Sequence, residues 1–348
     1  MKTVIEDMRT GLREEGIQQA GEIIKRGGLV AFPTETVYGL GANALDPEAS
    51  RKIYAAKGRP SDNPLIVHIA EWEALDFIVQ DIPEAARKLG EAFWPGPLTM
   101  IFARRETVPL ATTGGLETVA VRMPDHPVAL GLIRAGGGYI AAPSANTSGR
   151  PSPTRAQHVL EDMDGVIDMI IDGGEVGIGL ESTIVDFTED VPVILRPGYI
   201  NQEMIQRVIG EVEMDQALIG EDSSVRPKAP GMKYRHYAPK AQLYIVEGNQ
   251  EDVRRKIDEL AEREERQGRK AGVIVTEESV PFYRHGILKV IGSRGDELSI
   301  SRHLFGILRE FDEMDVQVIY SEAFHTPHMG QAIMNRLLKA AGHQIIKT

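Results

Sequence analysis

Two cations flank a glycine in a segment rich in turn-forming residues. Lys57 and Arg59 surround Gly58, and Pro60 and Asn63 follow them. Glycine readily ends a helix in a left-handed conformation, so both cations would leave a helix end together. Cations at a helix C-terminus also complement the helix dipole without any ligand. The chain is acidic overall, so two anchored cations at this place indicate a phosphate-binding site more than a simple interaction with the helix dipole.

A second polar segment follows an apolar run that ends at Ala142. The segment from Pro143 to Ser152 reads Pro-Ser-Ala-Asn-Thr-Ser-Gly-Arg-Pro-Ser. Its hydroxyl and backbone N–H groups could surround a phosphate, as those of glycine-rich loops do. The Walker spacing Gly-x-x-x-x-Gly-Lys-Ser/Thr is absent. The segment therefore indicates a phosphate site of another kind.

An arginine and a histidine occupy predicted strands. Arg122 directly follows three small or branched apolar residues, and a buried arginine there needs an anionic partner, for which a substrate carboxylate is one candidate. His68 shares one face of the run 65–69 with Ile66, and a lone strand histidine is usually a satisfied core residue. The segment 33–41, with two threonines, a carboxylate and glycines, is either a functional loop or a turn rich in threonine caps.

The elements that would position these residues alternate between short β-branched runs and helical patterns. The expected strands are 29–32, 65–69, 98–102, 119–122, 139–142, 169–171, 183–186 and 193–195, and the expected helices are 17–26, 47–57, 83–93, 127–134 and 155–163. Asp46 as N-cap and Pro47 at the first helical position mark the start of the second helix. The pattern predicts an α/β domain around a mixed sheet, spanning 1–212.

The rest of the chain predicts a linker and a smaller domain. Residues 213–240 lose periodicity and mix prolines with Tyr234, Arg235, His236 and Tyr237, so the linker could fold over a site as a lid. Residues 241–348 alternate strands at 242–246, 272–275, 288–291 and 317–320 with helices at 251–266, 299–311 and 330–341. This repetition predicts a small Rossmann-like parallel sheet, although the phosphate fingerprint Gly-x-Gly-x-x-Gly is absent.

Composition narrows the function classes. The chain has 348 residues, no cysteine and a formal net charge of −12, which excludes disulfide scaffolds and cysteine chemistry. It also disfavours a protein that mainly coats nucleic acid. With neither a signal peptide nor a membrane span in the sequence, we expect a cytoplasmic protein. His325 and His328 lack an evident third ligand, so no protein-held metal is expected.

Several motifs together resemble those of one family. Lys57-x-Arg59, Ser144-x-Asn146 and Pro33-Thr34-Glu35-Thr36-x-Tyr38-Gly39-Leu40 are similar to the signature of the YrdC family. The linker segment from Pro230 to Pro239 and the late run from Ala332 to Leu337 resemble its two-domain form, the threonylcarbamoyl-AMP synthases. These motifs occur in order over most of the chain.

The resemblance implies a nucleotidyltransferase for tRNA processing. Such enzymes convert L-threonine, bicarbonate and ATP, with Mg2+, to threonylcarbamoyl-adenylate and pyrophosphate. A separate transferase complex then uses the product to modify tRNA. The residues implied for ATP, with Lys57 and Arg59 also implied in catalysis, are Lys57, Arg59, Asn63, Thr118, Ala142, Ser144, Asn146, Ser152, Arg196 and Tyr234. Those implied for L-threonine are Thr34, His68, Arg122 and Ser182.

Two alternatives remain open. A related carbamoyl-adenylate-forming maturation factor would share the nucleotide site, but such proteins carry cysteine-rich zinc modules, which this chain cannot supply. An RNA-binding or ribosome-maturation module without adenylating activity would use Lys57, Arg59, Arg122, Arg150 and Arg196 to grip an RNA backbone. The net charge of −12 counts against it, so direct tRNA binding is expected to be weak or absent.

Overall fold

The computed structural model describes residues 2–215 and 236–348. They divide into two units, each with its own sheet. The second unit comprises residues 236–348 together with Gly149–Pro151 and Ile178–Leu180, and the first unit comprises the other described residues. The chain is therefore an α/β protein with a mixed-sheet unit followed by a parallel-sheet unit, as expected from the sequence.

The first unit is built on a mixed sheet of eleven strands in the order β1-β8-β2-β3-β7-β4-β6-β5-β9-β10-β11. The strands are β1 (Val4–Asp7), β2 (Val30–Phe32), β3 (Gly39–Asn43), β4 (Ile66–His68), β5 (Leu98–Ala103), β6 (Thr118–Arg122), β7 (Ile140–Ala141), β8 (Met169–Asp172), β9 (Thr183–Asp186), β10 (Val193–Arg196) and β11 (Glu213–Met214). In the centre of this sheet β6 runs parallel to β4 and antiparallel to β5. The ends of these three strands therefore determine which polar side chains meet.

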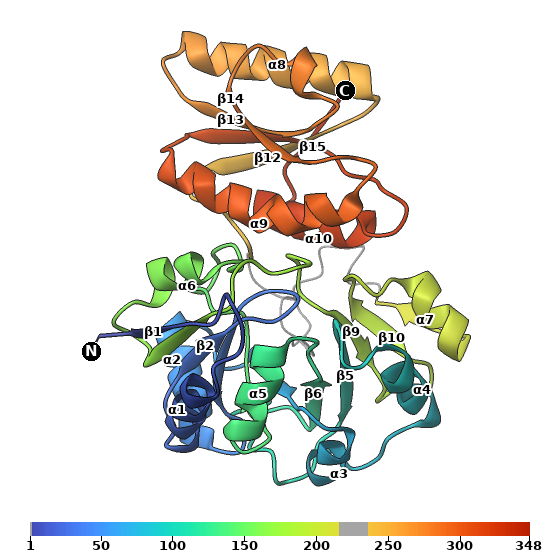
Figure 1. Cartoon of the computed structure of the whole chain (residues 1–348). Coiled ribbons are helices and arrows are strands. Elements are labelled where there is room, and N and C mark those ends of the chain that lie inside the picture. The colour runs from blue at the N-terminus through green and yellow to red at the C-terminus, as the bar shows by residue number, and fades with distance from the viewer. Residues whose placement is uncertain (1, 216–235) are drawn as a thin grey trace. The chain divides into compact units, whose positions relative to one another are not determined.

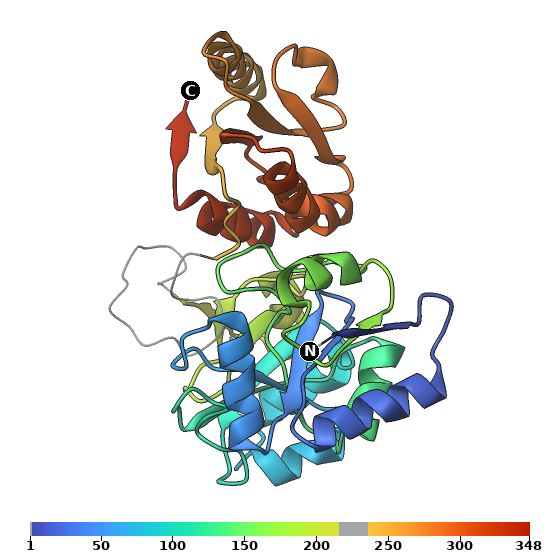
Figure 2. The same ribbon diagram turned by 90° about the vertical axis from the view of Figure 1, so that its left-hand side faces the viewer.

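Helices cover both faces of this sheet. The helices are α1 (Glu14–Lys25), α2 (Pro47–Lys57), α3 (Leu75–Ile78), α4 (Glu84–Phe93), α5 (Pro127–Ala135), α6 (Ala156–Met163) and α7 (Gln202–Ile209), with a 3-10 turn η1 (Trp72–Ala74). Residues of α1 and α5 share a core with Val30 and Phe32, whereas residues of α2, α4, α6 and α7 share the opposite core with Ala31. Successive strand residues point to opposite faces, so one strand serves both cores. Figure 2 shows α1 in dark blue and α2 in lighter blue on either side of the strands.

A third, smaller core lies over the central strands, and it places the polar residues of interest. It consists of Ile66, Ile101, Ala120, Ile184 and Leu195. Residues two apart along a strand share a face, so His68 follows Ile66 onto this face, and Arg122 follows Ala120. The expected alternation along 65–69 is confirmed, because Leu65, Val67 and Ile69 belong to the opposite core.

The second unit has a parallel sheet of five strands in the order β14-β13-β15-β12-β16. Its elements are β12 (Gln242–Glu247), α8 (Gln250–Arg266), β13 (Ala271–Thr276), η3 (Val280–Phe282), β14 (Ile287–Gly292), α9 (Glu297–Glu313), β15 (Val318–Glu322), α10 (Gly330–Ala341) and β16 (Ile345–Lys347). Figure 1 shows α8 on one face of this sheet and α9 and α10 on the other, the layering of a doubly wound fold.

The structure adds elements that the sequence did not predict. They are β1, β3, β11, β16, α3 and α7. The segment 33–41, expected to be a loop or turn, already joins the sheet at Gly39, where β3 begins and pairs with β2. β3 reads Gly-Leu-Gly-Ala-Asn, and its two glycines hide the strand from propensity. β11 is only two residues long and starts at Glu213, inside the stretch expected as linker.

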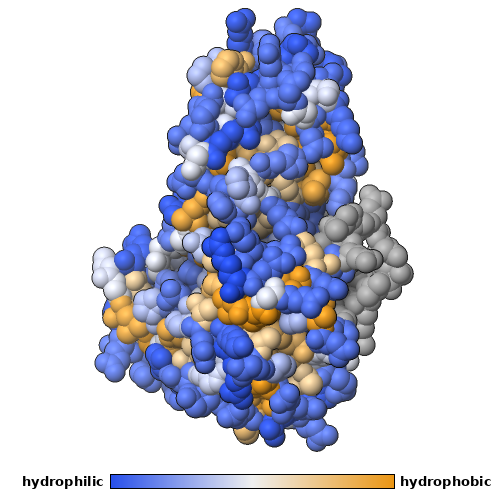
Figure 3. Space-filling model, turned by 90° about the vertical axis from the view of Figure 1, so that its right-hand side faces the viewer, coloured by the Kyte–Doolittle hydropathy of each residue, from blue (hydrophilic) through white to orange (hydrophobic). Residues whose placement is uncertain are grey.

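None of the helices in residues 2–215 and 236–348 is long and apolar enough to cross a membrane. Figure 3 shows the side of the molecule on which α4 and α7 lie, where apolar residues reach the surface among hydrophilic ones.

Candidate active site

Arg122 lies at the centre of a buried polar network. It ends β6, and its register partners are His68 on β4 and Thr99 on β5. The residue is only 4% exposed. Its Nη1 donates to Thr36 Oγ1 over 2.9 Å, and its Nε donates to the carbonyl of Gly96 over 3.3 Å. Both of these hydrogen-bond acceptors are neutral, and a buried guanidinium is well suited to a ligand carboxylate.

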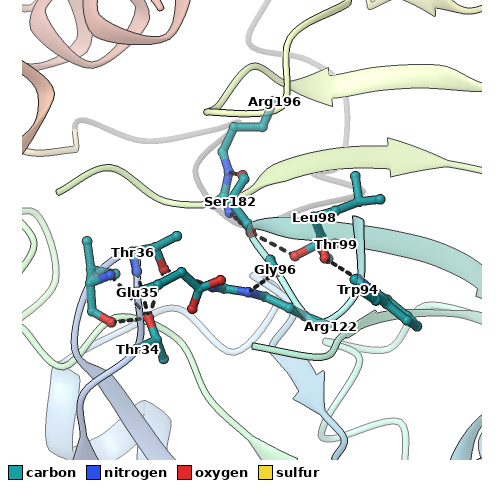
Figure 4. A network of polar contacts seen from close by, with 11 residues as sticks. Thr34, Glu35, Thr36, Trp94, Gly96, Leu98, Thr99, Arg122, Ser182 and Arg196 are labelled. Atoms are coloured by element: carbon teal, nitrogen blue, oxygen red, sulfur yellow. Dashed lines mark hydrogen bonds and ion pairs between the residues drawn. The ribbon is translucent and has the colours of Figure 1, made fainter. Parts of the chain in front are cut away.

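Glu35 supplies the one carboxylate that the structure pairs with Arg122 among the described residues. Glu35 Oε1 lies 2.6 Å from Arg122 Nη2, and the two side chains are 14% and 5% exposed. The angles of this ion pair lie outside hydrogen-bond geometry, and neither Glu35 oxygen has a hydrogen-bond donor in the described part of the chain. Figure 4 shows the Glu35 carboxylate beside the arginine. The pair is charged, buried and incompletely hydrogen-bonded.

The two threonines that flank Glu35 build the turn that holds it. Thr34 Oγ1 donates to the carbonyl of Val37 over 2.7 Å and accepts from the backbone N–H groups of Thr36 and Val37. The hydroxyls of Thr34 and Thr36 are 2.9 Å apart. Thr34 therefore shapes the loop through its own backbone, and the same loop brings Glu35 and Thr36 to Arg122.

His68 is a neutral group on the strand next to Arg122. Burial, and after it the positive charge of Arg122, lowers the pKa of His68 to about 3. Its Nδ1 lies 3.1 Å from the carbonyl of Ile66, and its ring meets the edge of Phe32 with centroids 6.1 Å apart. An uncharged imidazole at this place can orient a ligand but carries no charge to balance a carboxylate.

Ser182 and Arg196 continue the network on the other side of β5. Ser182 Oγ lies 2.7 Å from Thr99 Oγ1, and Arg196 donates to Ser182 through Nε to the carbonyl over 3.0 Å and through Nη2 to Oγ over 3.1 Å. Arg196 and Ser182 are 4% and 1% exposed. Figure 4 shows these side chains converging on the end of β5, near Trp94 and Leu98. The residue expected to hold threonine thus directly contacts one expected to hold ATP.

Lys57 and Arg59 leave the end of α2 as the sequence predicted. Asp46 caps the start of the helix by accepting from Glu48 N, and Gly58 ends it in the left-handed region at φ 59°. Lys57 is 1% exposed, and its Nζ donates to the carbonyls of Ser144 and Asn146. Lys57 therefore ties α2 to the loop that follows β7.

Arg59 and Asn63 form the neighbouring turn. Arg59 donates through Nε to the carbonyl of Asn63 over 3.2 Å and through Nη2 to that of Pro64 over 3.1 Å. The buried Oδ1 of Asn63 has no donor among the residues described. A buried acceptor of this kind is one that a ligand donor can satisfy.

The loop after β7 brings the other expected nucleotide residues together. Ser144 Oγ donates to Asn146 Oδ1 over 2.5 Å, and Asn146 Nδ2 donates to the carbonyl of Thr147 over 2.8 Å. Ala142 is held to β4 through its N–H to the carbonyl of Ile66. Ser152 Oγ donates to Glu181 Oε1 over 2.6 Å, next to Ser182 in the sequence.

One expected nucleotide residue does not join this network. Thr118 begins β6, where it pairs with Ala103, so it lies at the other end of that strand from Arg122, roughly 13 Å away along the backbone. Tyr234 lies outside the described residues.

Sequence reasoning missed several members of the network. Glu35 and Thr36 belong to the motif at residues 33–40, but they are far from Arg122 in the sequence. Only the fold brings them next to it. Thr99 carried no signal, and Glu181 stood out only as a polar residue at the start of a predicted strand. Strand register and loop closure bring them beside Ser182 and Ser152. His126 borders this region, and burial lowers its pKa while the charge of Glu35 acts in the opposite direction.

Comparison with known families covers most of the chain. Residues 22–198 match the Sua5/YciO/YrdC family model, described as telomere recombination. Residues 200–342 match the model described as the threonylcarbamoyl-AMP synthase C-terminal domain. The junction between the two models precedes α7 by only a few residues.

Full-length relatives carry one shared name. The chain is 51% identical over 345 residues to the threonylcarbamoyl-AMP synthase of Pyrococcus abyssi, covering 99% of both chains. It is 50% identical over 332 residues to that of Bacillus subtilis, covering 95% of this chain and 94% of the relative.

Solved structures show the same relationship. The crystal structure of Pyrococcus abyssi Sua5 complexed with L-threonine has a TM-score of 0.94 at 50% sequence identity, covering 99% of this chain and 100% of that one. The structure of Escherichia coli YciO, at 24% identity and a TM-score of 0.51 over 57% of this chain, shows the shared fold alone. With matches at this identity over almost its whole length, the chain belongs to the two-domain, Sua5-type threonylcarbamoyl-AMP synthases.

Proposed function

We propose that the buried network around Arg122 binds L-threonine and that the loop after β7, together with Lys57, Arg59 and Arg196, binds ATP. The enzyme is a threonylcarbamoyl-AMP synthase, a nucleotidyltransferase. Its substrates on this proposal are L-threonine, bicarbonate and ATP, and its products are threonylcarbamoyl-AMP and pyrophosphate. The relative solved with L-threonine supports the amino-acid part of the proposal.

The contact between Arg196 and Ser182 carries the proposal. Arg196 Nη2 donates to Ser182 Oγ over 3.1 Å, and Ser182 Oγ lies 2.7 Å from Thr99 Oγ1. Thr99 is in turn the residue of β5 that lies opposite Arg122 in the sheet. A cation for the nucleotide therefore adjoins a hydroxyl for the amino acid. This reaction requires such a junction, because a carbamate oxygen of threonine must meet the α-phosphate of ATP.

The chemistry asks for positioning and charge stabilisation more than for a protein nucleophile. The amino group of threonine and bicarbonate form a carbamate with loss of water, and a carbamate oxygen then attacks the α-phosphorus while the bond to pyrophosphate breaks. On this proposal Arg122 takes the threonine carboxylate, and Lys57, Arg59 and Arg196 offset the charge of the phosphates. Thr34 and His68 line the amino-acid side, and Asn63, Thr118, Ala142, Ser144, Asn146, Ser152 and Tyr234 complete the nucleotide side.

Magnesium fits this site as a companion of the nucleotide. In the described part of the chain, no group of three or more His, Cys, Asp or Glu side chains could hold a metal ion. Mg2+ usually keeps several waters and binds through substrate phosphates with few protein ligands. We therefore assign Mg2+ to the triphosphate of ATP, where it would neutralise part of the phosphate charge alongside Lys57 and Arg59.

The two units have separate tasks on this proposal. Residues 1–212 form the catalytic domain and 241–348 a smaller Rossmann-like domain. The stretch 213–240 between them is assigned as a linker and lid, and its residues 216–235 lie outside the described part of the chain. The labile product passes to a transferase complex that modifies tRNA, in the cytoplasm where the substrates are available. The inward bonds of Lys57, Arg59, Arg122 and Arg196 argue against an RNA-gripping surface, because each of these cations already donates to protein acceptors.

Substrate dependence tests the function. Pyrophosphate release should require both L-threonine and bicarbonate, because the carbamate is the only nucleophile that the site presents to ATP. The measurement is coupled-enzyme pyrophosphate detection in CO2-depleted buffer, with each substrate omitted in turn. Labelled bicarbonate should appear in the adenylate in step with pyrophosphate. Release that continues without threonine or without bicarbonate would contradict the proposal.

A further inference from the structure

Glu35 has a buried carboxylate that the protein leaves short of hydrogen bonds. Its side chain is 14% exposed, yet neither oxygen accepts a hydrogen bond from any described residue. Buried polar groups in native proteins nearly always have a hydrogen-bond partner, and a buried carboxylate that accepts none is costly even beside a cation. Such a group indicates a donor that arrives with a ligand.

The ion pair with Arg122 does not explain Glu35 as a residue that stabilises the fold. Arg122 is already held by Thr36 Oγ1 and by the carbonyl of Gly96. Desolvation of a buried ion pair offsets much of its attraction, and the 2.6 Å contact to Nη2 lacks hydrogen-bond geometry. The position of Glu35 beside Arg122 therefore points to a role in binding a ligand.

We propose that Glu35 accepts the α-amino group of the amino-acid substrate, while Arg122 takes its α-carboxylate. This inference rests on the proposed function, which places threonine at Arg122. An amino acid carries one positive and one negative group, both attached to its α-carbon. The pair of Arg122 and Glu35 presents the opposite charges side by side, so each substrate charge meets its complement in a region of low dielectric.

Among the described residues, Glu35 is the one carboxylate that forms an ion pair with Arg122. His68 is neutral because burial lowers its pKa to about 3. Thr34 Oγ1 already donates to Val37 O and accepts from two backbone N–H groups. An amino group bound without Glu35 would lie near the positive charge of Arg122 with no counter-charge.

The β-hydroxyl of threonine is the competing donor, and charge decides against it. A hydroxyl placed on Glu35 would satisfy one oxygen but would leave the ammonium uncompensated beside Arg122. On this inference Glu35 makes the site select amino acids over hydroxy acids. Glu35 does not contribute to the choice between threonine and its analogue without the β-hydroxyl.

Calorimetric binding of three small acids tests the assignment. The probes are L-threonine, L-2-aminobutyrate, which lacks the hydroxyl, and the 2,3-dihydroxybutyrate with the threonine configuration, which lacks the amino group. In Glu35→Gln we expect affinity for the two amino acids to fall roughly 10- to 100-fold, the range for a hydrogen bond to a charged group. Affinity for the dihydroxy acid should change little, and the ratio of threonine to 2-aminobutyrate should stay constant.

Two results would overturn the assignment. An equal loss for all three acids would show that Glu35 only holds Arg122 in place. A shrinking preference for threonine over 2-aminobutyrate would put the hydroxyl on Glu35 instead. Glu35→Asp, which keeps the charge on a shorter side chain, should retain part of the amino preference and gives the same comparison independently of how Glu35→Gln folds.

Controls separate this inference from the proposed function. Glu117→Gln removes a carboxylate paired with Arg104 over 2.9 Å, but one that is 78% exposed, and it should leave all three affinities unchanged. Arg122→Gln should abolish binding of all three acids. Unchanged binding in Arg122→Gln would show that threonine binds elsewhere, whatever the Glu35 variants do.

Discussion

At the scale of single residues, the cations of the site serve the fold as well as the ligand. Lys57 bonds to two loop carbonyls, and Arg196 holds both the carbonyl and the hydroxyl of Ser182. Removing such a cation leaves buried acceptors unsatisfied, which costs stability in addition to activity. Kinetic effects of substitutions here must therefore be measured together with the free energy of unfolding.

His68 gives the fold a dependence on pH that can be measured. Its pKa is about 3 in the folded chain and about 6.5 when exposed, so the unfolded state binds the extra proton between these values. The neutral histidine therefore contributes stability above about pH 6.5 that is lost as the pH falls toward 3. Between pH 6 and 4 the free energy of unfolding of wild type should fall more steeply than that of His68→Gln, by up to about 1.4 kcal/mol per pH unit.

Denaturant unfolding at several pH values measures both slopes. Other buried groups, His126 among them, titrate in both proteins and cancel in the difference. Parallel slopes for wild type and His68→Gln would show that His68 is protonated normally in the folded chain.

At the scale of elements, the end of α2 sets the direction of both phosphate-site cations. Gly58 has φ 59°, and a Cβ atom there would meet no atom within 4 Å, so alanine would bring backbone strain without a clash. Gly268, after α8, has φ 74° and equally open surroundings in the other unit. The two glycines form a matched pair of which one lies in the site.

Alanine at either glycine should lower the free energy of unfolding by about 1–2 kcal/mol. Only Gly58→Ala should also raise the KM for ATP, because relief of the strain redirects Lys57 and Arg59. Thermal unfolding and initial-rate kinetics check the two effects. Equal KM values for both variants would mean that the geometry of the helix end is not needed for ATP binding.

The sequence predicted most elements of this size because their signals are local. Both ends of α2 were predicted to the residue from Asp46, Pro47 and Gly58, and α10 was predicted from Gly330 to Ala341. β1 and β16 escaped prediction because they are short edge strands that gain stability from a neighbour more than from their own pattern.

The candidate site was predictable as a set of residues but not as a network. Arg122, Ser182 and Arg196 were expected from the resemblance. The place of Arg122 opposite Thr99, and that of Ser182 beside Thr99, depend on how β5 pairs with β6 and β9. The role of Glu35 could not be read from the sequence, because a carboxylate in a threonine-rich turn is normally a solvated group. Only the burial of its oxygens beside Arg122 distinguishes it.

At the scale of the whole molecule, each unit has a core of its own. Ile53 on α2 and Ile257 on α8 are both fully buried, and they belong to different hydrophobic clusters. Truncation of a buried isoleucine to alanine typically costs about 2–5 kcal/mol, so each variant should destabilise its own unit by that amount.

Calorimetry of Ile53→Ala and Ile257→Ala tests this independence. We expect each substitution to lower the unfolding transition of one unit and to leave the other transition in place. A single transition shifted equally by both substitutions would show that the units unfold as one cooperative body.

The short strand β16 has a consequence for self-association. Ile345, Ile346 and Lys347 pair with one edge of β12, whose other edge is taken by β15. Without these three residues, the backbone groups along β12 would lie open as a template for a foreign strand. β16 thus covers this edge of the second unit, and we expect loss of its pairing with β12 to favour self-association.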